Sequence, residues 1–466
     1  MTAEIHRRYA AYVASRYRRA RRIAGIAALG ESLIRLALAT IAVWLGLMST
    51  PALALTFSIQ PGQPFTPMPI AVPGFAGDPA LAAQISQIVA NDLKLSGYIN
   101  PLDPASYLDK VVAAEASPNF NNWTTIGAQA LVAGTVQNQG GQITAAVRLW
   151  DVSTGQQMFG QQFATTPDNI RRLGHIIADA VYSKLTGFKG FFDTRVVFVS
   201  ESGPKTQRIK KLALMDWDGA NLRFLTQGQD LVLTPRFSPS TQQVAYMAYA
   251  QQGNPKVFIL NTANGSRQLV GEYTGMTFSP RFSPDGSKLV FSVEHEGNSN
   301  IYVMDLATRQ AQQLTNDASI NTSPCFSPDG SQIAFESDRG GAQQIYLMNS
   351  DGSNQHRVTF GNGRYATPVF SPDPENAYIA FTKQDSTGFK IGVMKSDGSQ
   401  ERIIADGYHN EGPSWAPNGR YVMYFTEGGG ATGGASVWFA DVTGTVNVQV
   451  KTPGFASDPS WSPLLR

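Results

Sequence analysis

The side chains that most often carry out chemistry are few in this sequence. Four histidines follow residue 54, namely His175, His295, His356 and His409, and the chain has a single cysteine, Cys325. A zinc site needs three or four converging His, Cys or carboxylate ligands. Only His295 and His409 are expected on one surface, and they belong to parts of it that lie far apart. The sequence therefore predicts no metal site and no cofactor.

Catalysis by a nucleophile is not indicated either. Cys325 lies in an apolar strand and is interpreted as a small buried side chain, and one cysteine excludes an intramolecular disulfide. The sequence contains no G-x-S-x-G motif. The aspartates that follow prolines, Asp285, Asp329 and Asp373, are interpreted as turn residues. The chain is thus predicted to have no catalytic residues.

A five-residue motif, Pro-x-Phe/Trp-Ser/Ala-Pro, recurs six times and organises most of the chain. Its copies begin 44–46 residues apart, at Pro235, Pro280, Pro324, Pro368, Pro413 and Pro459. Self-similarity at such a period indicates a repeat fold.

The same succession of elements follows most copies of the motif. A turn such as Asp285-Gly286 supplies the positive φ of a tight hairpin, and strands such as 288–292, 301–304 and 312–315 come after it. The middle strands are continuously apolar, which predicts burial on both faces. A four-stranded sheet covered on both faces by similar sheets is a β-propeller blade. A β-solenoid, the alternative repeat fold, fits four strands per unit less well.

The strand count predicts how the ring closes. The strand at 195–199 has no motif before it, and the last motif, 459–463, has no strand after it. Six complete blades form only if the C-terminus completes the first blade. We therefore predict a six-bladed β-propeller over residues 191–466, sealed by residues 457–463 beside strand 195–200, which removes two exposed sheet edges. Propellers also serve as enzymes, so a propeller hydrolase or peptidase-related enzyme is the alternative function.

Residues 55–190 lack the repeat and are predicted to form a separate α/β domain. A strand is expected at 68–72, and Asp78-Pro79 starts a helix that runs to Leu95. A second amphipathic helix is expected at 167–185. Three segments read as a meander of strands, at 131–136, 143–152 and 156–163. Two helices on a small sheet make a two-layer α/β domain.

The first 54 residues have the composition of an export signal. Seven arginines between residues 7 and 22 precede thirteen uncharged residues at 36–48, and a small-residue site follows at 52–54. This order is typical of a secretory signal peptide, here cut after residue 54. A helix of that length spans only about 20 Å, short of the roughly 30 Å core of a bilayer. An uncleaved membrane anchor is the weaker alternative.

The charge distribution limits the choice of partners. The net charge of the chain is +2, but its first 54 residues carry eight arginines and two glutamates, so the remainder is −4. Nucleic-acid binding requires a basic face. The sequence therefore predicts no nucleic-acid partner, and no small-molecule substrate is expected.

The repeats and the first domain together resemble the TolB family of the Tol-Pal system. Similar repeats occur in the propellers of prolyl oligopeptidases, so the first domain makes the resemblance specific, and it covers residues 55–466. It rests on these segments: Trp123 with Gly127-Ala128, Leu131–Gly134, Leu149–Asp151, His175–Asp179, Leu185–Gly187, Phe192–Arg195 and Asp216–Gly219. Trp150 and Trp217 stand where tyrosine is expected.

The resemblance implies a monomeric periplasmic scaffold of the trans-envelope Tol-Pal complex. In that family the propeller binds the outer-membrane lipoprotein Pal, and the mature N-terminal segment is bound by the inner-membrane protein TolA. The assembly supports outer-membrane integrity and invagination at cell division. In this chain the TolA-binding segment is expected within residues 55–66, at Leu55, Thr56, Phe57, Ser58, Ile59 and Gln60.

One rim of the propeller is expected to bind Pal. The Pro-Asp-Gly turns lie on the rim where the linker enters, so the first domain should crowd that side and leave the loops before each motif free. The family's Pal contacts correspond to Met276, Ser279 and Thr322, and exposed rim residues suited to a protein partner are added at Tyr365, Tyr408 and His409. Met276 replaces a polar residue expected there. Whether an ion occupies the propeller channel stays open.

Overall fold

A computed structural model describes residues 59, 61–249, 253–273, 275–374, 377–428 and 433–465. The predicted signal peptide and most of the predicted TolA-binding segment, residues 55–58 and 60, lie outside these described residues. The described residues belong to one compact unit, Phe57–Arg466.

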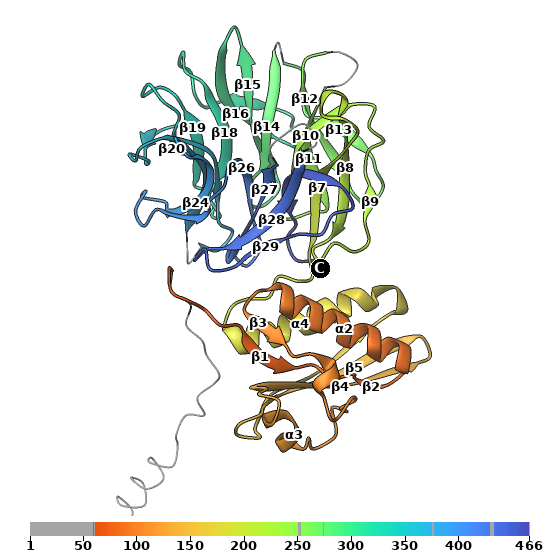
Figure 1. Ribbon diagram of the computed structural model, residues 1–466. Coiled ribbons are helices and arrows are strands. Elements are labelled where there is room, and N and C mark those ends of the chain that lie inside the picture. The colour runs from red at the N-terminus through yellow and green to blue at the C-terminus, as the bar shows by residue number, and fades with distance from the viewer. Residues whose placement is uncertain are drawn as a thin grey trace, which may run out of the picture. The chain divides into compact units, whose positions relative to one another are not determined.

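The N-terminal region is a two-layer α/β structure, as the sequence predicts (Figure 1). Its sheet has the order β3-β1-β4-β5-β6, with β2 paired to β4, and its first three strands are parallel. The strands are β1 (Met68–Ala71), β2 (Ala76–Gly77), β3 (Ile99–Pro101), β4 (Ala130–Gln139), β5 (Gln142–Asp151) and β6 (Gln157–Thr165). The helical segments are α2 (Pro79–Leu95), η1 (Pro104–Ser106), α3 (Phe120–Thr124), η2 (Pro167–Asn169) and α4 (Ile170–Thr186).

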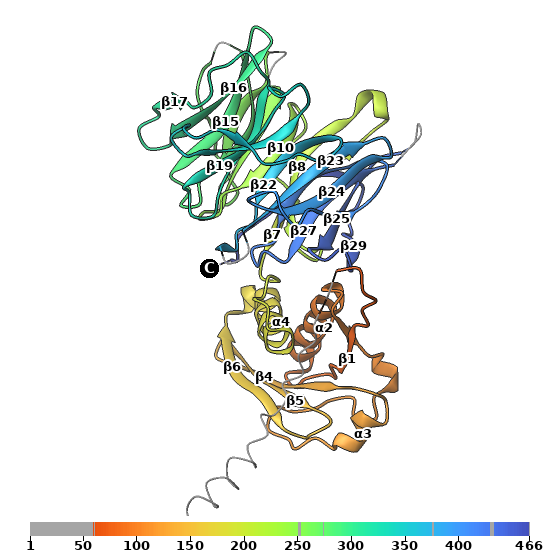
Figure 2. The same cartoon turned by 90° about the vertical axis from the view of Figure 1, so that its left-hand side faces the viewer.

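Helices α2 and α4 cover one face of this sheet, side by side (Figure 2). Asp78 caps α2 by accepting a hydrogen bond from the backbone N–H of Leu81, and Pro79 occupies the first turn. Gly187 ends α4 in a left-handed conformation at φ 77°. None of the helices in the described residues has both the length and the apolar run that a membrane crossing needs.

Six four-stranded antiparallel sheets form the propeller. Blade 1 consists of β30 (Phe455–Trp461), β7 (Arg195–Ser202), β8 (Ile209–Asp216) and β9 (Arg223–Phe224), with η3 (Lys205–Gln207) in its hairpin. Blade 2 is β10 (Leu231–Phe237), β11 (Gln243–Tyr249), β12 (Lys256–Asn261) and β13 (Arg267–Leu269), and blade 3 is β14 (Met276–Phe282), β15 (Lys288–His295), β16 (Asn298–Asp305) and β17 (Ala311–Gln313).

The remaining blades repeat this order. Blade 4 is β18 (Asn321–Phe326), β19 (Gln332–Ser337), β20 (Gln344–Asn349) and β21 (His356–Arg357). Blade 5 is β22 (Arg364–Phe370), β23 (Tyr378–Asp385), β24 (Gly388–Lys395) and β25 (Arg402–Ala405), and blade 6 is β26 (Asn410–Trp415), β27 (Tyr421–Glu427), β28 (Ala435–Asp441) and β29 (Asn447–Gln449). The apolar middle strands are buried on both faces, as their composition predicts.

The C-terminal strand closes the ring by pairing with the first propeller strand. In the antiparallel ladder between β30 and β7, Phe455 lies opposite Glu201 and Trp461 lies opposite Val196. The indole N–H of Trp461 donates to the hydroxyl of Thr194 over 2.9 Å. The predicted closure is confirmed, with the pairing starting two residues earlier than expected.

The proline-flanked aspartates hold turns, as the sequence predicts. The Asp285 carboxylate accepts the N–H of Ser287, and Asp329 does the same for Ser331. Hydrogen bonds from Ser283 and Ser287 lower the pKa of Asp285 to about 2. A carboxylate held in this way stays ionised and fixes the hairpin, which accounts for its recurrence.

Each innermost strand bulges immediately before its motif proline. The ladder between the first two strands of every blade shifts register at this point. The bulge residues all have positive φ, namely Thr234 (47°), Ser279 (52°), Ser323 (53°), Thr367 (49°), Gly412 (68°) and Asp458 (50°). A non-glycine residue is strained there. The bulge breaks the pairing just before the motif, and the motif's second residue then lines the channel in each blade.

Candidate partner-binding rim

The loop rim is the end of the propeller at which the innermost strands begin. Residues four positions before each motif proline recur around it, at Leu231, Met276, Ile320, Arg364, His409 and Phe455. Leu231, Ile320 and Phe455 are exposed, as are Phe360 and Tyr408 in the preceding loops. Tyr408 keeps 78% and Phe360 76% of its surface accessible. Large exposed apolar groups gathered on one face are characteristic of protein-binding surfaces.

The predicted Pal contacts fall into three groups. Met276, Ser279 and Thr322 are partly buried at the start of innermost strands, and Ser279 is a strained bulge residue. Tyr408 is the exposed aromatic that was expected. The expectation that Tyr365 is exposed is wrong: its side chain is fully buried, packs on Phe381 at 5.3 Å between ring centroids, and donates to Glu401. Successive side chains along a strand point to opposite faces, and in β22 Tyr365 faces the interior whereas Arg364 is exposed.

His409 is partly buried beside the exposed Tyr408. Its ring lies against Phe389, with the ring centroids 4.6 Å apart, and its Nε2 is 3.6 Å from the Glu411 carboxylate. Phe389 belongs to blade 5 and His409 precedes blade 6, so this contact joins neighbouring blades on the rim. The other rim histidine, His295, belongs to blade 3 and is exposed.

Ion pairs hold the rim loops in place. The guanidinium of Arg339 is 2.9 Å from Asp317, in the loop before blade 4, and donates to the side chain of Asn321, the first residue of β18. In blade 5, the Lys383 ammonium is 2.7 Å from Glu401. Loops fixed by such contacts lose less conformational entropy when a partner binds.

Two carboxylates, the buried Glu336 and the partly buried Asp458, stabilise the bulges from inside the ring. The N–H of Thr367 donates to Glu336 over 3.3 Å, and the N–H of Thr234 donates to Asp458 over 3.3 Å. Bulges leave backbone N–H groups unpaired in the ladder, and these carboxylates accept from two of them. Burial raises the pKa of Glu336 to about 7, although the Thr367 N–H opposes the shift.

The raised pKa of Glu336 predicts a pH dependence of stability. The native protein holds this proton more tightly than the unfolded chain, so its contribution to stability falls as the pH rises from about 4.5 to about 7. Glu336→Gln is expected to make the melting temperature less dependent on pH between about 4.5 and 7. It is also expected to stabilise the protein at pH 8 by about 1–3 kcal/mol. Glu296→Gln, at an exposed site, is the control, and an identical profile in both variants would contradict the assignment.

The predicted TolA-binding segment is described only at Ile59. That side chain is partly buried and, with Phe188, Tyr378 and Arg420, lines a cavity of about 430 Å³. The other five residues of the prediction, Leu55, Thr56, Phe57, Ser58 and Gln60, are outside the described part of the chain.

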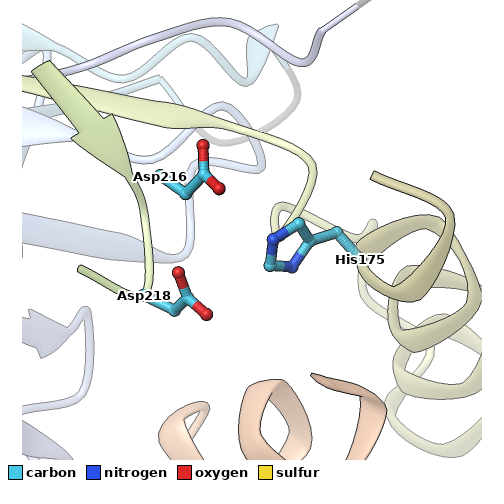
Figure 3. Close-up of side chains that lie close together, drawn as sticks. All are labelled: His175, Asp216 and Asp218. Atoms are coloured by element: carbon cyan, nitrogen blue, oxygen red, sulfur yellow. The ribbon is translucent and has the colours of Figure 1, made fainter. Parts of the chain in front are cut away.

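A charged network joins helix α4 to the end of strand β8 (Figure 3). His175 Nδ1 lies 2.6 Å from the buried carboxylate of Asp92, which also accepts the indole N–H of Trp217. Asp216 and Asp218 point toward the His175 ring, and the three could offer ligand atoms within 4.8 Å of one another.

Two carboxylates of this network, Asp216 and Asp218, already share an arginine. The guanidinium of Arg171 donates to Asp216 over 3.1 Å and to Asp218 over 2.6 Å. A metal ion would have to displace this guanidinium. Burial lowers the pKa of His175, but the charge and hydrogen bond of Asp92 together with the charge of Asp218 outweigh it, and the net shift is upward. The arrangement is best described as an ion-pair network that fixes α4 against the propeller strand.

Sequence reasoning identified the rim loops and Tyr408 but missed three other exposed apolar side chains on the rim. Leu231, Ile320 and Phe360 were not singled out, although 42% of the Ile320 surface is accessible. The signal that could have found two of them is positional, because Leu231 and Ile320 share the fourth place before the motif. An apolar residue at this loop position is not needed for packing within or between the blades, so it points to a binding surface.

Comparisons with known proteins agree with this architecture. The family described as TolB beta propeller domain matches residues 182–465, and the TolB amino-terminal domain matches residues 58–158. The crystal structure of TolB from Acinetobacter baumannii is 28% identical, with a TM-score of 0.77, and the match covers 87% of this chain and 98% of that chain.

More distant structures share only part of the fold. A structure assigned to TolB from Agrobacterium tumefaciens is 21% identical with a TM-score of 0.45, over 58% of this chain and 92% of that one. An oligogalacturonate lyase from Vibrio parahaemolyticus is 14% identical with a TM-score of 0.37, over 55% and 74%. Neither structure is evidence about the function of this chain. The two family matches and the Acinetobacter structure identify the family, and the chain belongs to the TolB family of periplasmic Tol-Pal proteins.

Proposed function

We propose that this protein is a non-enzymatic scaffold that binds Pal through the loop rim and TolA through its mature N-terminal segment. In this role it supports outer-membrane integrity and invagination during cell division. An exported chain cut after residue 54 would begin with that segment. The observation that carries the proposal is the set of exposed apolar side chains around the loop rim, at Leu231, Ile320, Phe360, Tyr408 and Phe455.

The chemistry of the rim supports a protein partner. Apolar and aromatic side chains supply most of the energy of protein interfaces when they enter pockets on the partner. The ion pairs of Arg339 and Lys383 order the loops that present them. The buried Glu336 and the partly buried Asp458 lie behind the rim, so basic or amide groups of a partner that reach them would find complementary acceptors.

Rim variants test the Pal interaction. Ile320→Asp and Thr322→Arg each place a charge on the rim, and Tyr408→Ala removes its most exposed aromatic ring. Each is expected to weaken binding of purified Pal by about tenfold or more, as for an interface residue worth 1–2 kcal/mol. Isothermal titration calorimetry with the full mature chain measures this directly.

Matched controls separate binding from folding. Leu108→Asp and Phe224→Ala alter equally exposed apolar residues elsewhere, on the N-terminal region and on the outer strand β9. They are expected to bind Pal like the wild type. Unchanged Pal affinity in all three rim variants, with melting temperatures also unchanged, would exclude the loop rim as the binding face.

The TolA interaction is tested at the other end of the mature chain. Deleting residues 55–66 is expected to abolish retention by immobilised TolA, while Pal binding persists because the rim is untouched. Retention of the truncated chain by TolA would show that this segment is not the contact.

A further inference from the structure

The end of the channel opposite the loop rim contains a cavity of about 340 Å³. The second residue of every motif copy lines it, one from each blade, namely Arg236, Arg281, Cys325, Val369, Ser414 and Ser460. Phe237, Trp415 and Trp461 supply apolar walls. The repeat thus places six side chains of different chemistry in one ring.

Two neighbouring members of this ring are arginines without an ion-pair partner. Arg236 is only 8% exposed, and its one hydrogen bond is donated to the carbonyl of Pro235 over 2.8 Å. The side chain of Arg281 makes no ion pair or hydrogen bond within the described residues. Arginine remains charged at neutral pH. Buried charges in proteins are ordinarily paired, because an unpaired one loses its hydration without compensation.

The other charged groups near the pair do not neutralise it. Burial and, to a smaller extent, the charge of Arg281 lower the pKa of Arg236 to about 9, although the charge of Asp458 opposes the shift. Burial also lowers the pKa of Arg281. Asp458 acts from the loop side of the channel, where its carboxylate accepts the N–H of Thr234. No carboxylate of the described residues lies within ion-pair distance of either guanidinium.

Two serine hydroxyls complete a set of donors. The Ser460 oxygen accepts the N–H of Phe237, and the Ser414 oxygen accepts the N–H of Trp461, each over 3.0 Å. Because each oxygen is engaged as an acceptor, its own hydrogen is left to donate, and it has no acceptor among the described residues. Guanidinium and hydroxyl groups that surround a small cavity are the donors that oxyanions bind.

We propose that this end of the channel binds a small oxyanion, a carboxylate or phosphate group, between Arg236 and Arg281. The serine hydroxyls supply further hydrogen bonds, and the aromatic walls lower the local dielectric so that the attraction is stronger than in water. The site is independent of the loop rim and of Pal or TolA.

Anion-dependent melting tests the site. At constant ionic strength and pH, sodium chloride is replaced stepwise by sodium phosphate or, in a second arm, by sodium acetate. Once the site is saturated, the melting temperature of the full mature chain is expected to rise by about 2 °C for each further tenfold increase in anion concentration. The arm with the larger rise identifies the preferred group. Arg236→Gln and Arg281→Gln are expected to lose the rise, while Arg309→Gln, outside the channel, keeps it.

The single cysteine gives a second, local measurement. Cys325 lies in the same ring and is the only thiol of the chain. An anionic methanethiosulfonate reagent is expected to modify it about tenfold faster than a cationic one, after correction for their rates with free cysteine. Phosphate should slow the anionic reagent, and Arg281→Gln should reduce the ratio.

Two results would overturn the proposal. One is a melting temperature that rises with anion concentration equally in the wild type, Arg236→Gln and Arg281→Gln, or that rises in none of them. The other is equal modification rates for the two reagents without protection by phosphate. If neither reagent reaches Cys325, the melting series decides by itself.

Discussion

A chain that lacks residues 459–466 is expected to melt about 10 °C or more below the full mature protein. The deletion removes Trp461, whose indole donates to Thr194 and packs between Phe191 and Phe439. It also removes the Ser460–Val197 and Trp461–Val196 pairs that join β30 to β7, so only the first half of the closing ladder remains. Trp461→Ala alone is expected to cost about 3–5 kcal/mol, since it empties a large buried site. Differential scanning calorimetry measures both.

A shorter truncation provides the control for ring closure. Deleting only residues 464–466 leaves every pair of the β30–β7 ladder in place. Its melting temperature is expected to stay within a few degrees of the full protein. If the long deletion melted like this control, the terminal strand would contribute little, and the ring would be held by blade-to-blade packing alone.

Asp92→Ala is expected to destabilise the protein by about 3–5 kcal/mol at pH 7. The carboxylate is fully buried and is the partner of His175 Nδ1 and of the Trp217 indole N–H. Alanine leaves both donors without an acceptor in the interior. Chemical denaturation with urea gives the change in the free energy of unfolding.

The surroundings of Asp92 also predict the pH response of this variant. Burial raises the pKa of Asp92 to about 6, although His175 lowers it, and Asp92 raises that of His175. The native pair therefore holds a proton more tightly than the unfolded chain, and its contribution to stability decreases as the pH rises. The loss caused by Asp92→Ala should be greater at pH 6 than at pH 8. Asp168→Ala, at an exposed position before the same helix, is the control, and an equal loss in both variants would refute the network.

Much of the architecture was predictable because the signals were local and repeated. The spacing of the motif prolines gives six blades, and the unmatched strand at 195–199 predicts that the tail completes blade 1. The Asp78-Pro79 start of α2 and the Asp285 and Asp329 turns follow from capping and turn chemistry within a few residues. Such features depend on backbone preferences that neighbouring residues determine.

The rim was predictable as a set of loops but not residue by residue. Tyr365 and Tyr408 both precede or begin innermost strands, yet one is buried and the other is exposed. The difference depends on which way each side chain points across the pleat and on contacts of Tyr365 with Phe381 and Glu401, which are distant in the chain. The sequence of one loop determines neither the direction of a side chain nor its contacts with residues that are distant in the chain.

The sequence by itself determined the number of blades, their strand order, the turns and the closure of the ring, because each depends on a periodic or short-range pattern. Only the tertiary structure decided which side chains share a space. Arg236 and Arg281 stand 45 residues apart in the chain and meet in one channel, and Asp92, His175 and Trp217 come together from two helices and a propeller turn. Ring closure and helix packing bring these groups into one low-dielectric interior, where their charges and hydrogen bonds act on one another.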